Sequence, residues 1–63
     1  MKASERLGKI ADGLQEQRDE LRRLAIDLPN GRTLELVEFI EVRLRIDIGS
    51  LRAEAALLRR WAD

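Results

Sequence analysis

Side chains that could act as nucleophiles are few in this sequence. It contains no cysteine or histidine, and its only hydroxyl groups belong to Ser4, Thr33 and Ser50. Nucleophilic catalysis needs such a group beside a base in a concave pocket. Ser4 and Thr33 stand where helices are expected to begin and a hydroxyl caps the helix, whereas Ser50 follows Gly49 at a break in the pattern. We therefore assign no catalytic residue and expect that the chain is not an enzyme.

Paired carboxylates are the next group that could do chemistry, because they bind metal ions. Glu38 and Glu41 lie one helical turn apart, a spacing that symmetric helix bundles use for carboxylate metal sites. Such sites usually also enlist histidine, and both glutamates fall on the polar stripe of the second expected helix. We interpret both as solvent-exposed and expect no metal and no cofactor.

Arginine clusters could contact phosphate groups. The two clusters are Arg18, Arg22 and Arg23 in the first half of the chain and Arg52, Arg59 and Arg60 in the second. Acidic residues such as Asp19, Glu20 and Glu54 are interleaved with them, and the 12 basic residues are balanced by 12 acidic ones. A neutral chain gains little long-range attraction to nucleic acid or to an anionic membrane. We interpret the clusters as salt-bridged solvent faces and keep nucleic-acid binding as an alternative.

The elements that must position these residues are two helices separated by one strong break. The sequence Pro-Asn-Gly at 29–31 stops the first helix, because proline restricts the preceding residue and Asn-Gly accepts turn conformations easily. We predict a first helix at about 4–28, a turn at 29–32 and a second helix at about 33–62. Residues 1–63 then form a single all-α domain, a two-helix antiparallel hairpin.

The first expected helix has one apolar seam. Its members are Leu7, Ile10, Leu14, Leu21, Leu24 and Leu28. Gln17 takes the one polar position of this heptad pattern. A polar residue there could fix the register or the oligomeric state by hydrogen bonding across the interface, or it could sit at a wet edge and contribute little. Both interpretations of Gln17 stay open.

The second expected helix is apolar on two sides. The first stripe consists of Val37, Ile40, Leu44, Ile48, Leu51, Ala55, Leu58 and Ala62. The second stripe consists of Phe39, Val42, Ile46, Ala53 and Leu57. A helix with two apolar faces needs two neighbours, and this chain supplies only one other long helix. We predict that the second stripe, together with Trp61, forms an interface with another molecule, although Trp61 could instead cap the end of the bundle core.

One passage also has the pattern of a strand. Residues 41–48 alternate between charged and apolar side chains and are rich in β-branched types. A ribbon-helix-helix dimer would pair such a strand with its copy. We favour the helix, because the apolar stripe continues through the passage without a missed position.

The size and composition of the chain favour assembly. A chain of 63 residues buries only about 60% of its unfolded surface, and without cysteine or histidine it has neither disulfides nor ordinary zinc sites to stabilise it. Its longest apolar run, residues 55–58, is far below the roughly 20 residues of a membrane span. No secretion leader opens the sequence. We expect a soluble cytoplasmic protein.

These observations favour a noncatalytic protein–protein interaction module. We expect the hairpin to dimerise into a four-helix bundle and to bind another protein as an adaptor, inhibitor or regulatory subunit. One alternative is a nucleic-acid-binding regulator, built either as a bundle like that of the plasmid-encoded Rop protein or as a ribbon-helix-helix-type dimer. The Rop comparison is architectural only. Another alternative is a structural assembly subunit.

Overall fold

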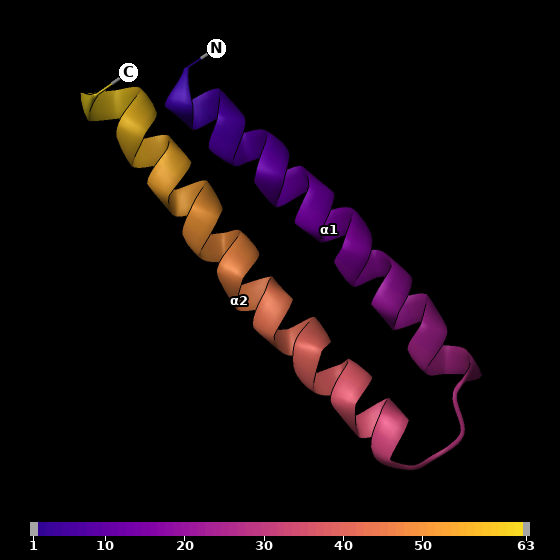
Figure 1. The fold of residues 1–63 in the computed structure, drawn as a ribbon. Coiled ribbons are helices and arrows are strands. Elements are labelled where there is room, and N and C mark those ends of the chain that lie inside the picture. The colour runs from indigo at the N-terminus through magenta and orange to yellow at the C-terminus, as the bar shows by residue number, and fades with distance from the viewer. Residues whose placement is uncertain (1, 63) are drawn as a thin grey trace.

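The chain folds into two antiparallel helices joined by a short turn (Figure 1). The computed structural model describes residues 2–62. Helix α1 is Ala3–Asp27 and helix α2 is Arg32–Trp61, so each helix begins and ends one residue earlier than the sequence indicated. The turn lies at one end of the molecule and the outer ends of both helices at the other (Figure 1). The predicted all-α hairpin is thereby confirmed.

The turn depends on proline and glycine. Leu28, which precedes the proline, is extended, with φ −86° and ψ 139°, because the proline ring disfavours the helical conformation in the residue before it. Gly31 has φ 156° and ψ −170°, a conformation that a residue with a Cβ atom rarely adopts. The N–H group of Glu35 then donates to the carbonyl oxygen of Gly31 at 3.1 Å, which begins α2.

Both predicted helix caps are wrong. The N-cap residues are Lys2 for α1 and Gly31 for α2, and neither makes a side-chain capping bond. Ser4 lies inside the first turn of α1 and is buried, while Thr33 is the second residue of α2 and is exposed. A positive φ at Gly31 turns the chain directly into α2, so the helix starts before the threonine can cap it.

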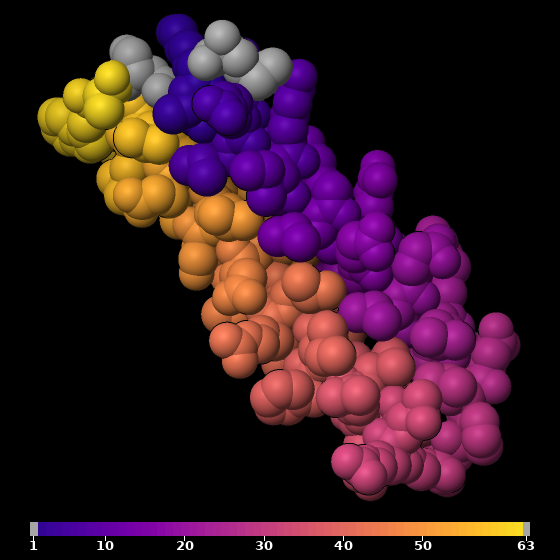
Figure 2. Space-filling model, in the orientation of Figure 1, coloured from indigo at the N-terminus to yellow at the C-terminus, as the bar shows by residue number. Residues whose placement is uncertain are grey.

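The two helices meet along a regular seam. From α1 and the residue after it, the seam takes Ser4, Leu7, Ala11, Leu14, Arg18, Leu21, Ala25 and Leu28, all buried or half-buried. On α2 it consists of Leu34, Val37, Glu41, Leu44, Ile48, Leu51, Ala55 and Leu58, likewise buried or half-buried. Steps of three and four keep both rows facing each other, as in coiled coils. Figure 2 shows side chains of the two helices in contact along the hairpin.

This seam differs from the predicted one on one side of each helix. Ile10 and Leu24 of α1 are 54% and 46% exposed, and Gln17 is exposed too. Ile40 of α2 and Ala62, which follows α2, are exposed. The leucine row of α1 is as predicted, but its companion row begins at Ser4 and contains small residues and an arginine. Small side chains let the helices approach closely, so the more apolar row of α1 stays outside.

The buried core is thin. Among residues 2–62 the buried apolar side chains are Ala11, Val37, Ile48 and Ala55, and the leucines of the seam are half-buried. The radius of gyration is 14.5 Å, against about 11 Å for a compact domain of this length. Two helices without a third layer cannot enclose their large side chains, so the hairpin alone has little apolar burial to stabilise it.

Residues 41–48, which alternate as a strand would, lie within α2. The part of the chain that the structure describes contains no strand, so the ribbon needed by a ribbon-helix-helix dimer is absent there. The apolar stripe, and not the local alternation, determines the conformation of residues 41–48, because a lone strand would leave its backbone groups unpaired. Neither described helix has an apolar stretch long enough to cross a membrane.

Candidate functional site

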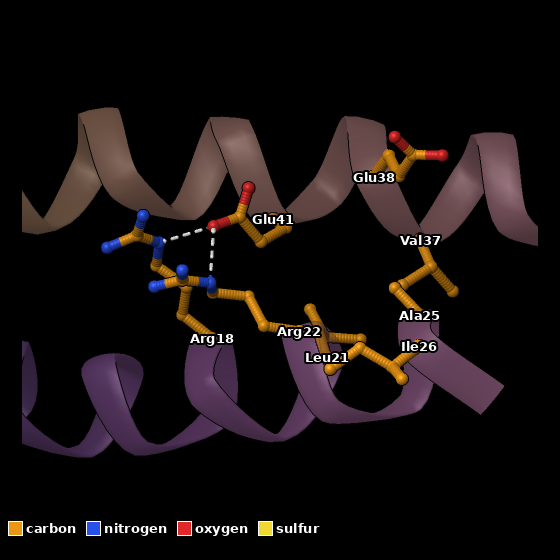
Figure 3. Close-up of a pocket in the computed structure, with 8 residues that line it drawn as sticks. All are labelled: Arg18, Leu21, Arg22, Ala25, Ile26, Val37, Glu38 and Glu41. Carbon is orange, nitrogen blue, oxygen red and sulfur yellow. Dashed lines mark hydrogen bonds and ion pairs between the residues drawn. The ribbon is translucent and has the colours of Figure 1, made fainter.

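A largely buried ion pair crosses the seam between the two helices. The Nε–H group of Arg18 donates to Oε1 of Glu41 at 2.7 Å, and both side chains are only 18% exposed. The Nε atom of Arg22 lies 3.9 Å from the same oxygen. Figure 3 shows both guanidinium groups, carried by α1, converging on this one carboxylate of α2. The expected solvent exposure of Glu41 is therefore wrong, because an arginine of the opposite helix draws the carboxylate into the seam.

This contact, and not Gln17, holds the polar position of the seam within the hairpin. Arg18 follows Gln17 directly, so the polar position differs by one residue from the predicted one. The long stem of Arg18 covers apolar surface while its charged end reaches Glu41. The sequence signal that could have found the pair is a single basic and a single acidic residue at seam positions of opposite helices.

A hollow of about 400 Å³ lies beside this ion pair. Its lining is Arg18, Leu21, Arg22, Ala25, Ile26, Val37, Glu38 and Glu41. Figure 3 shows the carboxylate of Glu38 pointing away from the arginines, and the apolar side chains grouped toward the turn. This lining holds no hydroxyl, thiol or imidazole group, and both of its arginines are directed at Glu41. The hollow therefore lies between the two helices, and its lining presents no nucleophile.

The two glutamates considered for a metal site are separated in role. Glu41 binds Arg18 and approaches Arg22, while Glu38 is exposed. Within residues 2–62 there is no group of three or more side chains placed to hold a metal ion. Although the two glutamates lie one helical turn apart, they do not act together, because Glu41 binds an arginine of α1 and Glu38 faces solvent.

Several arginines of the two clusters contact carboxylates. Arg23 contacts Glu20 one turn earlier on α1, and Arg52 of α2 lies 3.3 Å from Asp12 of α1. These contacts are exposed, unlike the one in the seam. Acidic side chains therefore neutralise much of the positive charge locally, as the interleaved sequence indicated.

The side of α2 that faces away from α1 is the second candidate. We call it the outer face, and it comprises Glu35, Phe39, Val42, Ile46, Gly49, Ala53, Ala56, Leu57 and Arg60, all exposed. Phe39 is 65% exposed and Ile46 59%. A shallow hollow of about 380 Å³ lies between Phe39, Val42, Arg43, Ile46 and Asp47. The second apolar stripe thus has no cover within residues 2–62, as predicted.

The predicted interface residues all belong to exposed surface. Ala53 and Leu57 are exposed on the outer face, and Trp61 is 77% exposed beside it. This high exposure shows that the Trp61 ring does not close the end of the described seam, and the guanidinium carbon of Arg60 lies 5.8 Å from the ring centre. Leu36 of α2 and Ile26 of α1 are also exposed. Neither belongs to an apolar stripe, so periodicity gave no signal for them.

No protein-family model matches the chain, and no curated protein or solved structure matches it either. The seam contact and the outer face are therefore the features from which a function can be inferred.

Proposed function

We propose that this protein is a noncatalytic interaction module that self-associates, and docks a protein partner, through the outer face of α2. Two hairpins together form a four-helix assembly. The observation that supports this most directly is the exposure of large apolar side chains on the outer face, while the buried apolar residues of the described chain are few. Covering Phe39 and Ile46 would stabilise an assembly by about 25 cal/mol for each Å² of apolar surface removed from water.

The surface area of the chain agrees with an uncovered interface. The solvent-accessible surface is 5056 Å², whereas a compact monomer of 7.3 kDa exposes about 4,200 Å². The excess of about 900 Å² is close to the roughly 800 Å² that each partner contributes to an interface of standard size. Exposed apolar side chains that gather on one face, as on the outer face, are typical of proteins that bind other proteins.

A role as adaptor, inhibitor or regulatory subunit fits the chemistry of the seam. Its charged groups bind one another across the helices, and Ser4, the buried hydroxyl, lies at the far end of α1 from the ion pair. The absence of cysteine makes the fold independent of redox conditions, which is compatible with the cytoplasm proposed for it.

Self-association through the outer face can be tested with Ile46→Glu. Analytical ultracentrifugation at micromolar concentration should show a dimer for the unaltered chain and a monomer for the variant, because the glutamate would lose its water on assembly. Circular dichroism should show that the variant remains helical, since Ile46 is exposed in the hairpin.

The matched control is Ile26→Glu, the same substitution at an exposed isoleucine of α1. This variant should sediment as a dimer. A monomeric unaltered chain, or a dimer that persists in Ile46→Glu, would contradict the proposal.

A further inference from the structure

The outer face changes character along α2. Its first half carries the large side chains of Phe39, Val42 and Ile46, and its second half carries the small residues Gly49, Ala53 and Ala56, with Leu57 as its one large apolar side chain. All of them are exposed. A surface that is raised in one half and lowered in the other fits a reversed copy of itself, because each large side chain then meets a small one.

We propose that the occupant of the outer face is the outer face of a second copy, with the two α2 helices antiparallel about a two-fold axis between Asp47 and Ile48. This inference rests on the proposed function and specifies its partner. Ile46 then faces Gly49 of the partner subunit, and the next layers outward are Val42 with Ala53 of the partner subunit and Phe39 with Ala56 of the partner subunit. Each of these three layers joins one large and one small residue, and Leu57 comes level with Glu38 of the partner subunit.

Charge supports the antiparallel direction. In this register Glu35 at the start of the outer face meets Arg60 of the partner subunit, and the two-fold axis repeats the pair at the other end. On one flank Arg43 approaches Glu54 of the partner subunit. On the other flank Arg45 approaches Arg52 of the partner subunit, a like-charge contact that solvent screens and that Asp12 already offsets within each chain.

A parallel pair would lose these advantages. In register, it would place Glu35 beside the partner subunit's Glu35 and Arg60 beside the partner subunit's Arg60. It would also place Phe39 beside the partner subunit's Phe39 while leaving a gap between two copies of Gly49. Both like charges and uneven packing disfavour that direction.

Gly49, unlike the glycines of α1, lies on the outer face next to the proposed two-fold axis, where it leaves room for a second helix. A Cβ atom added there would meet nothing within 4 Å inside the chain, and alanine would favour the helix. The hairpin therefore does not need glycine at this position. A second helix crossing beside the two-fold axis does, because the absence of a side chain lets the two backbones approach.

The same geometry orders the four helices. The outer face lies opposite the seam, so the two α2 helices would occupy the centre and each α1 helix would lie outside its own α2. In a square four-helix bundle, by contrast, each helix contacts two neighbouring helices through two of its faces, and these faces are about a right angle apart around the helix axis. The proposed dimer is thus a layer of four helices in which only α2 makes the contact.

Cysteine cross-linking distinguishes the two directions, since the chain has no cysteine of its own. The double variant Val42→Cys, Ala53→Cys should form covalent dimers on mild oxidation, whereas Val42→Cys alone should not. The two positions are about 16 Å apart within one helix, too far for a bond inside the chain. Efficient cross-linking of Val42→Cys alone, or none in a double variant that ultracentrifugation shows to be dimeric, would overturn the antiparallel register while leaving self-association intact.

A second pair of variants tests the close approach. Gly49→Leu should raise the dimer Kd by about tenfold or more, because the side chain enters the crossing point. Gly13→Leu makes the same change at a glycine of α1 with open space and should leave the Kd unchanged. Both should remain helical. An unchanged Kd in Gly49→Leu overturns the inference alone, whereas a monomeric unaltered chain overturns the proposed function with it.

Discussion

The two sides of α2 differ less in their apolar content than in what they face. On the seam side Ile48 is buried and only 4% exposed, whereas two residues earlier Ile46 is open to solvent. The seam side contains a charged residue, Glu41, while the outer face has no charged residue between Glu35 and Arg60. The intramolecular contact thus uses the side with a charge in its middle, because α1 supplies its counterion, and leaves for another molecule the side whose charges lie only at its two ends.

Among the substitutions that compare the two sides of α2, Ile48→Glu should cause the largest loss of folding stability. A carboxylate at this buried position would have no counterion prepared for it, and we expect a loss of about 3–5 kcal/mol. That loss is comparable to the whole stability of so small a domain, so the variant should be largely unfolded by circular dichroism. Ile46→Glu, two residues away, should keep its helices. Equal helix content in the two variants would show that the two sides are not distinguished by burial.

A smaller effect is expected when the seam charge loses its partner. Glu41→Ala leaves Arg18 half-buried and unpaired, and we expect thermal or urea unfolding to show a loss of about 1–2 kcal/mol. Replacing both residues by leucine should recover that stability, since well-packed apolar pairs substitute for buried ion pairs at little cost. If the double variant is less stable than Glu41→Ala, the ion pair contributes more to the free energy of unfolding than an apolar pair at the same positions does.

The smallest effect belongs to the ion pair at the edge of the seam. Arg52 and Asp12 join the same two helices at 3.3 Å, but both side chains are more than half exposed. Arg52→Ala should therefore change the free energy of unfolding by less than about 0.5 kcal/mol, and added salt should change it little further. A loss as large as that of Glu41→Ala would mean that burial does not set the strength of these contacts.

The hairpin itself could be predicted because its signals are local. The break at 29–31 and the periodicity on either side place both helices to within one residue. The seam was only half predicted. The leucine row of α1 was found, but the row with Ile10 and Leu24 is richer in apolar residues than the row that contains Arg18, and it lies outside. Counting apolar residues on one helix cannot reveal a charge on the opposite helix.

The candidate site was also predicted only in part. The outer face followed from the second stripe, because a helix apolar on two sides has one face that this chain cannot cover. The seam contact was missed, because Glu41 aligns with polar residues on its own helix. Its burial depends on the register between two antiparallel helices, which brings Arg18 to the same level. The register depends on how the two helices pack together, so it cannot be predicted from the apolar stripe of either helix alone.

The position of the turn also determines how the molecule bears mechanical load. Whatever precedes α1 or follows α2 leaves from the same end of the hairpin (Figure 1). A force that pulls those two ends apart therefore peels the helices from each other one turn at a time, as a zipper opens, and never loads all contacts together. The seam residues nearest the open end, Ser4 of α1 and Leu58 of α2, would separate before the contact between Arg18 and Glu41. Such a protein should give way under tension far more easily than its resistance to heat would indicate.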